Sequence, residues 1–180
     1  MIIGCFLYWD HKKGRNVALD SFKCFINNLN KISLGAECKN NYFLSELLGV
    51  NYNTLRGWMA NNRCPKLSTL DSIADKLGIG TADLLNPNFC FEVLKGKKQN
   101  NSVYYFRKNL QEVFIANNKT TWQERESLLF AFISVDSLKS FFKKSNYRSP
   151  SLKQLDSIAS ALGINPYKLI SEEFLYEKDQ

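Results

Sequence analysis

Two side chains that can recognise base pairs lie three residues apart in the stretch NYNTLRGWMA, residues 51–60. In the major groove of DNA, an asparagine can form two hydrogen bonds with adenine, and an arginine can form two with guanine. Asn53 and Arg56 would share one face of a helix at this spacing. Gly57 would lie beside them, and Tyr52 near the helix start could contact a thymine methyl group or a phosphate. We predict that these four residues contact base edges.

Polar and cationic residues surround this face and are suited to phosphates, which position a protein on DNA without reading its sequence. Gly57 costs a helix about 1 kcal/mol relative to alanine. Either a close approach of the backbone to DNA or plain tolerance on an exposed face explains it. The same polar face also suits a solvated surface on an ordinary helical bundle. The predicted phosphate contacts are Asn51, Thr54, Asn61, Asn62, Arg63 and Lys66.

The elements that would hold these residues form two helices joined by a short turn. A helix is expected over residues 41–48, although the preceding GAECKNN gives no strong capping signal. Gly49 allows the turn, and Asn51 is a good N-cap for a second helix that ends near residue 60. The inward face of that second helix would carry Leu55, Trp58 and Met59. Two helices around a glycine-containing turn indicate a helix-turn-helix, whose second helix enters the major groove.

The chain repeats itself, which indicates a duplicated unit. Residues 65–85 pair without a gap with residues 150–170, and 11 of the 21 pairs are identical. In both copies the apolar spacing is helical, and a glycine, Gly78 or Gly163, ends the helix. Upstream, residues 21–34 match residues 102–115 more loosely. We read each copy as about five short helices, because neither contains a convincing strand pattern.

The segment LSELLGVNYNTLRGWMANNRCPKLSTLDSIADKLGIGTADLL resembles the lambda-repressor-like (Cro/repressor, XRE) helix-turn-helix family. The resemblance covers the family's second to fifth helices, with residues 25–34 as a first. It implies an all-α protein that binds operator-type DNA, usually as a dimer. The expected architecture is two tandem five-helix lambda-repressor-like domains with a short apolar N-terminal extension. The expected divisions are an extension at 1–20, domain 1 at 21–94, a linker at 95–101 and a diverged domain 2 at 102–180.

The second copy keeps the packing residues better than the reading face. Phe132 replaces the turn glycine, and Val135 and Asp136 replace Tyr52 and Asn53. An aspartate faces phosphates unfavourably, although it can accept a hydrogen bond from cytosine. The second copy could read a second half-site, grip the DNA backbone, or bind a subunit or protein partner. Its candidate DNA contacts are Ser134, Lys139, Ser140, Lys143, Lys144 and Arg148.

Composition limits the classes of function. The 180 residues carry a net charge of +7, which suits a polyanionic partner. A single histidine and the absence of nucleotide-binding and hydrolase motifs indicate no enzyme. No metal site is expected, because no C-x-x-C pair occurs, and no cofactor is predicted. The five cysteines suggest free thiols in a reducing cytoplasm. The apolar start, MIIGCFLYW, is too short for a membrane span of about 20 residues.

The sequence therefore predicts a cytoplasmic DNA-binding regulator of transcription, acting as a repressor on double-stranded DNA. A homodimer and a protein partner for domain 2 stay open. The alternative is a protein-interaction module on the same scaffold, such as an antitoxin or a phage-encoded inhibitor of a host system. Fold does not decide between the two functions.

Overall fold

Ten helices and no extended strand make up the described part of the chain, so the fold is all-α, as the sequence predicted. The structure is a computed structural model, and it describes residues 20–90, 100–130, 132–145 and 147–176. Almost all of the predicted N-terminal extension and most of the predicted linker lie outside these residues. No helix within these ranges is long and apolar enough to cross a membrane.

Three of the first five helices begin at polar side-chain caps that the local sequence supplies. The side chain of Asp20 accepts a hydrogen bond from the Lys23 N–H at 2.9 Å, and Asn51 accepts one from Asn53 at 2.8 Å. Asn40 caps the second helix, which corrects the expectation that its preceding loop gives no strong cap. The first five helices are α1 (Ser21–Gly35), α2 (Asn41–Leu48), α3 (Tyr52–Met59), α4 (Leu67–Leu77) and α5 (Thr81–Leu84).

The next five helices follow the same order with nearly the same lengths. The first, fourth and fifth members of each set are 15, 11 and 4 residues long in both. We call α1–α5 the first repeat and α6–α10 the second repeat. The helices of the second repeat are α6 (Ser102–Ala116), α7 (Trp122–Leu128), α8 (Val135–Phe141), α9 (Leu152–Leu162) and α10 (Pro166–Leu169).

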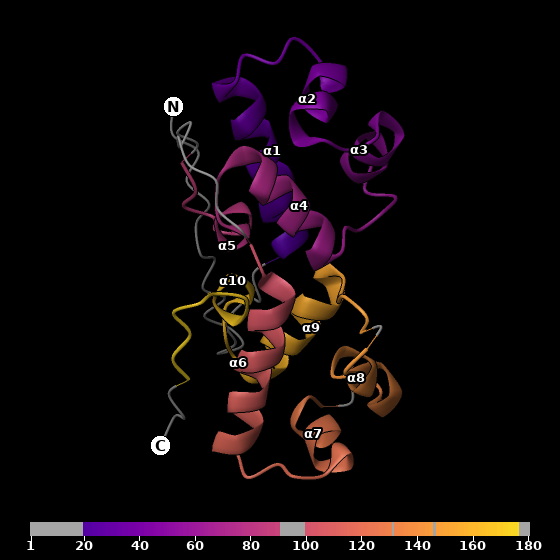
Figure 1. The fold of residues 1–180 in the computed structure, drawn as a ribbon, viewed down its shortest axis with the longest axis vertical. Helices are drawn as coiled ribbons and strands as arrows, with labels where there is room; N and C mark the ends of the chain where they lie inside the picture. Colours follow the sequence, from indigo (N-terminus) through magenta and orange to yellow (C-terminus); the bar gives the residue numbers. More distant parts are fainter. Residues whose placement is uncertain (1–19, 91–99, 131, 146, 177–180) are drawn as a thin grey trace, which may run out of the picture.

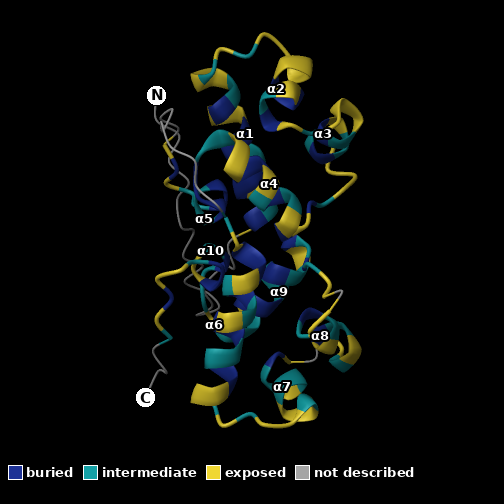
Figure 2. Cartoon of the chain, viewed as in Figure 1, coloured by how far each residue is buried: buried dark blue, intermediate teal, exposed yellow. Residues whose placement is uncertain are grey.

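An edge-to-face aromatic pair anchors the third helix of each repeat to the first. The ring centroids of Phe25 and Trp58 lie 5.6 Å apart, and those of Phe106 and Phe141 lie 5.6 Å apart. Leu55 is fully buried beside this pair, as predicted. Burying one such side chain contributes about 1.5–3 kcal/mol. The buried side of each third helix, dark blue in Figure 2, therefore fixes which residues face outward.

A buried asparagine closes each repeat. The Asn28 amide donates to the carbonyl groups of Leu84 and Asn86 at 3.0 and 2.9 Å. Asn109 makes the two equivalent bonds in the second repeat, at 3.0 and 2.8 Å. Each amide satisfies one carbonyl group of the last residue of the short fifth helix and one just beyond it, because buried backbone polar groups need partners. The loose sequence match around these two asparagines thus marks a shared structural role.

The two repeats pack against each other about an approximate twofold axis. Figure 1 shows the first repeat in one half of the elongated molecule and the second in the other. At the centre, α1 contacts α9, α4 contacts α6, and α5 contacts α10. The backbones cross there, where the Leu67 N–H donates to the Pro150 carbonyl at 3.0 Å and the Leu152 N–H donates to Pro65 at 3.2 Å. Buried side chains of both repeats form one hydrophobic core.

The turn before the third helix differs between the repeats. Three residues separate α2 from α3, and Gly49 takes a left-handed conformation with φ 68°. Six residues separate α7 from α8, and the left-handed residue is Phe130, with φ 51°. The alignment had placed Phe132 at the glycine position. That expectation is wrong, because the left-handed residue of the longer turn is Phe130, which lies two positions before Phe132.

Candidate nucleic-acid interface

The outward face of α3 is open in the structure. The side chains of Asn53 and Arg56 are exposed, and Tyr52 keeps 41% of its accessible surface. Leu55 and Trp58 on the opposite side are 0% and 3% exposed. The helix thus presents two hydrogen-bonding side chains on a buried apolar support. This arrangement holds the side chains outward without requiring a ligand.

Gly57 lies under the side chain of Arg63 and not in open space. A Cβ atom added at Gly57 would lie 3.2 Å from the Cδ atom of Arg63. The Gly57 carbonyl also accepts the N–H groups of Asn62 and Arg63, at 2.9 and 3.2 Å. The missing side chain therefore gives room for Arg63 to fold back along the end of α3. This provides a third reason for glycine here, beyond approach to DNA and plain tolerance.

The remaining first-repeat candidates flank α3 at both ends. The Asn51 side-chain oxygen caps the helix, which leaves its amide NH₂ group for a ligand. Thr54 is half-buried at the same end. At the other end Asn61 adopts φ 57°, and Asn61, Asn62 and Lys66 are all exposed. The structure thus places the predicted phosphate contacts around the predicted base contacts.

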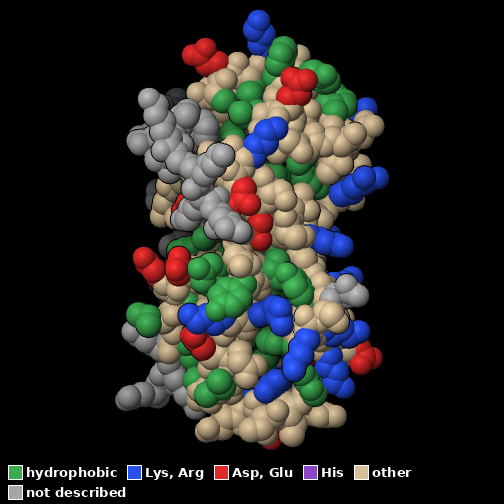
Figure 3. Space-filling model, in the orientation of Figure 1, with side chains coloured by type: hydrophobic (Ala, Val, Ile, Leu, Met, Phe, Trp, Pro, Cys, Tyr) green, Lys and Arg blue, Asp and Glu red, His purple; other side chains and the backbone are tan. Residues whose placement is uncertain are grey.

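The cations of this region have no carboxylate partner among the described residues. The one ion pair within those residues joins Lys108 and Glu112, at 3.9 Å on α6. Arg56, Arg63 and Lys66 are therefore exposed positive charges that no described acidic side chain neutralises. Figure 3 shows Lys and Arg side chains gathered along the edge that carries α3 and α8. Such an uncompensated positive edge attracts a polyanion.

The second-repeat candidates lie along the same edge of the molecule, as Figure 1 shows for α8. Lys139, Lys143, Lys144 and Arg148 are exposed. The two serines are less available. The Ser134 hydroxyl lies 3.1 Å from that of Ser137 and also caps α8. The Ser140 hydroxyl donates to the Ser137 carbonyl at 2.6 Å.

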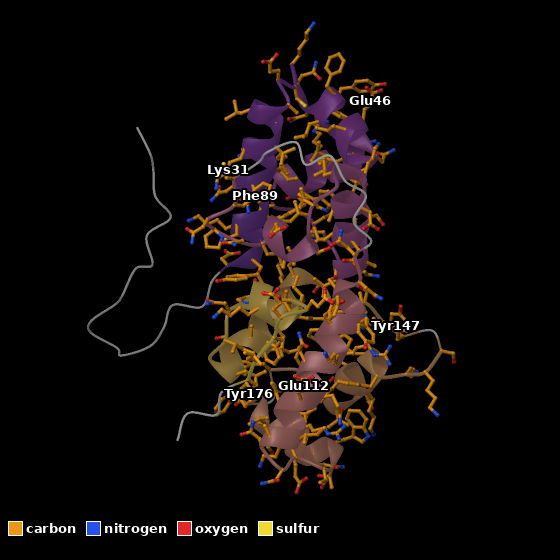
Figure 4. All side chains as sticks on the ribbon, turned by 60° about the vertical axis from the view of Figure 1, so that its left-hand side comes forward. Lys31, Glu46, Phe89, Glu112, Tyr147 and Tyr176 are labelled. Atoms are coloured by element: carbon orange, nitrogen blue, oxygen red, sulfur yellow. The ribbon has the colours of Figure 1, made fainter. Side chains whose placement is uncertain are left out.

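An aromatic contact fixes the loop between α8 and α9. The guanidinium carbon of Arg107 lies 4.9 Å from the ring centre of Tyr147, which is labelled in Figure 4. Arg107 also donates to the Lys143 carbonyl at 3.4 Å. These contacts tie the lysine-rich loop to α6, and neither residue was predicted from the sequence. No spacing signal points to them, because the loop is three residues longer than its counterpart between α3 and α4.

Lys153 is a further exposed cation that the sequence did not single out. It follows the antiparallel bridge between Lys66 and Ser151, where the two repeats cross. Its counterpart in the first repeat is Ser68, so comparison of the copies gives no hint of a shared function. Only the crossing of the backbones brings Lys153 close to the predicted phosphate contact Lys66.

No described group of histidine, cysteine, aspartate and glutamate side chains could hold a metal ion. Burial raises the pKa of the Cys64 thiol near the crossing of the repeats, although the Lys153 backbone N–H lowers it in part. A raised pKa keeps this thiol protonated and therefore weakly nucleophilic.

Comparison with protein-family models, curated proteins and solved structures gave no match.

Proposed function

We propose that the chain is a sequence-specific DNA-binding regulator that represses transcription through α3. In this proposal each repeat is a five-helix lambda-repressor-like domain, and the first repeat reads the DNA. The chain then needs no catalytic residue or cofactor. Its partner is double-stranded DNA, whose phosphates complement the positive edge.

The observation that carries the proposal is the bare polar face of α3 beside unpaired cations. Asn53 and Arg56 have the geometry for adenine and guanine, with each bidentate pair worth about 1–3 kcal/mol of discrimination. Arg63 and Lys66 continue the positive charge beyond the helix end. A merely solvated helix would not require this combination of base-reading side chains and adjoining unpaired cations.

The proposal is tested by selecting bound sequences from random duplex DNA with the full chain. The regulator predicts enrichment of a defined site, and affinity for that site should fall steeply with salt concentration. Arg56→Ala should then lose about 1–3 kcal/mol of binding free energy and relax specificity at one base pair. Fluorescence anisotropy with the selected duplex and its single-base variants measures both effects.

Lys168→Ala is the matched control, because it removes one exposed charge from α10, on the edge away from α3. It should keep the affinity of the parent protein to within about twofold, since distant charges are screened beyond roughly 10 Å in 0.1 M salt. If selection enriches no sequence, or if Arg56→Ala binds every duplex as the parent protein does, α3 does not read DNA.

A second candidate function, protein interaction through the second repeat, is favoured by two aromatic side chains. Phe130 and Phe132 are 70% and 61% exposed in the turn between α7 and α8, with ring centroids 6.5 Å apart. Replacing both by serine should leave DNA binding unchanged in vitro. If a partner protein binds there, repression of a reporter in cells should fall while the affinity for DNA stays the same.

A further inference from the structure

The second repeat has a definable role on DNA if α3 reads a site, so this inference rests on the proposed function. It starts from how firmly the repeats are joined. The Asp71 carboxylate accepts the Ser102 N–H at 3.2 Å, and the equivalent Asp156 accepts the Ser21 N–H at 3.2 Å. Each repeat thus caps the first helix of the other. The two repeats are therefore joined by reciprocal hydrogen bonds as well as by a shared hydrophobic core.

Two cationic positions are shared by the outward faces of the two repeats. Lys139 on α8 takes the place of Arg56, and Arg148 takes the place of Arg63. The Arg148 N–H donates to the Ser140 carbonyl at 3.0 Å, as the Arg63 N–H donates to the Gly57 carbonyl at 3.2 Å. The same backbone bond therefore sets both arginines at the ends of their helices, despite the longer loop before Arg148.

The base-reading positions are not shared. Asp136 takes the place of Asn53, and Val135 takes the place of Tyr52. A carboxylate in the first turn of α8 repels phosphates and cannot form the bidentate pair with adenine. The Ser140 hydroxyl donates its hydrogen bond to the Ser137 carbonyl. The second repeat therefore keeps groups that bind phosphate and lacks the groups that read bases in the first.

The exposed cations also connect the two helices. Lys66 lies at the backbone crossing, and Lys153 follows it on the second repeat. Beyond them, Lys143 and Lys144 continue to the end of α8, without a described carboxylate in ion-pair contact. Figure 3 shows this positive edge running between the two helix-turn-helix segments. A single stretch of duplex could thus contact both repeats at once.

We infer that one molecule of this chain binds an asymmetric DNA site as a built-in pseudo-dimer. The first repeat reads base pairs through α3, and the second repeat grips phosphates of the adjoining duplex through Lys139 and Arg148. The site then has one specified half and one unspecified half. No second copy of the chain is needed to complete the contact.

The test uses the full chain with the duplex selected for the proposed function. Native mass spectrometry should show one chain per duplex. Lys139→Ala and Arg148→Ala should each weaken binding to specific and unrelated duplexes alike, by roughly five- to tenfold in 0.1 M salt, because each removes about one phosphate contact. The slope of log affinity against log salt should fall by about 0.9 per variant. Lys168→Ala, the matched control, should change neither quantity.

A duplex shortened from its unspecified end supplies an independent readout. Shortening should weaken binding of the parent protein but should have little effect on the Lys139→Ala, Arg148→Ala double variant, whose grip is already lost. Two chains per specific duplex, or equal responses of parent and double variant to shortening, would overturn the inference and leave the proposed function standing. Failure to select any sequence would instead overturn the proposed function.

Discussion

The carboxylate of Asp156 accepts the backbone N–H of Ser21 across 135 residues of sequence, at 3.2 Å. Asp71 makes the reciprocal contact with Ser102. The two aspartates occupy equivalent positions of the repeated segment, and each stabilises the start of a helix in the opposite repeat. A helix N-terminus leaves N–H groups without intrahelical partners and favours negative charge. The duplicated unit thus uses one residue type to join its two copies.

The first prediction concerns these reciprocal caps. At pH 4, Asp156→Ala should lower the free energy of unfolding by about 0.5–2 kcal/mol, the usual cost of removing a capping side chain. Asp71→Ala should cost more, because Asp71 also accepts a hydrogen bond from the hydroxyl of buried Thr81 at 2.6 Å. Urea denaturation measures both. Asp136→Ala on the exposed face of α8 is the control and should change stability by less than about 0.5 kcal/mol.

A second prediction follows from the protonation of Asp156. Burial raises the pKa of Asp156 from its ordinary value of 3.8 to about 6, while hydrogen bonding from Ser21 lowers it in part and the nearby Asp20 charge raises it. Between pH 4 and 6 the folded chain therefore binds more protons at this residue than the unfolded chain. The contribution of Asp156 to stability should decline as pH rises through this window.

Asp156→Asn tests this linkage, since asparagine keeps a hydrogen-bond acceptor and does not ionise. The stability of the variant relative to the parent protein should increase between pH 4 and pH 6 and then level off. Urea denaturation across this range gives the difference at each pH. A constant difference, or one that decreases with rising pH, contradicts the assigned pKa.

The third prediction uses the capping box at the start of α7. The Glu124 carboxylate accepts the N–H groups of Thr121 and Thr120 at 2.8 and 2.9 Å. These bonds, in that order of effect, lower the pKa of Glu124 from 4.5 to about 2. Because the folded pKa is depressed, the stabilisation is complete above pH 4.5 and is lost as pH falls through 2. Glu124→Ala should therefore melt below the parent protein at pH 7, and the gap should close near pH 2.

Glu112→Ala is the matched control for that comparison. Its carboxylate forms the exposed 3.9 Å ion pair with Lys108 and no capping bond. Exposed pairs of this kind contribute about 0.3–0.5 kcal/mol. Its melting temperature at pH 7 should thus stay close to that of the parent protein. An equal loss in both variants would mean that the capping bonds of Glu124 do not stabilise α7.

Sequence patterns determined the helices better than the contacts between them. The matched copies placed α1 and α6 to within one residue at their C-terminal ends, because apolar periodicity is a local signal. The glycines predicted to end α4 and α9, Gly78 and Gly163, are left-handed in the structure. The Asn40 cap was missed because it follows a loop without apolar periodicity. Sequence alone did not identify the roles of Asp71 and Asp156. Their partners lie in the other repeat, and no local pattern identifies them.

The candidate interface shows the same division. Exposure of Asn53 and Arg56 followed from helical periodicity once Leu55 and Trp58 were placed inside. The contact between Gly57 and Arg63 could not be foreseen, because it depends on how the chain folds back after α3. Left-handed Asn61 directs that return. Sequence spacing gives no measure of where a loop side chain will lie.

The final prediction separates stability from binding at Gly57. Gly57→Ala should stabilise the helix by up to about 1 kcal/mol, the difference in propensity between the two residues. The new Cβ atom would lie 3.2 Å from Cδ of Arg63, so that the exposed arginine side chain must shift by a few tenths of an ångström. We therefore expect a modest loss of affinity for all duplexes, because Arg63 binds phosphate in the proposed function.

Arg63→Ala completes this test as the matched variant, because it removes the displaced side chain itself. Combining it with Gly57→Ala should add stability without any further loss of affinity for DNA. Urea denaturation and fluorescence anisotropy give the two quantities for the single and double variants. If Gly57→Ala instead weakens binding to one sequence selectively, the backbone of α3 approaches base edges at this position, and glycine serves the reading of DNA directly.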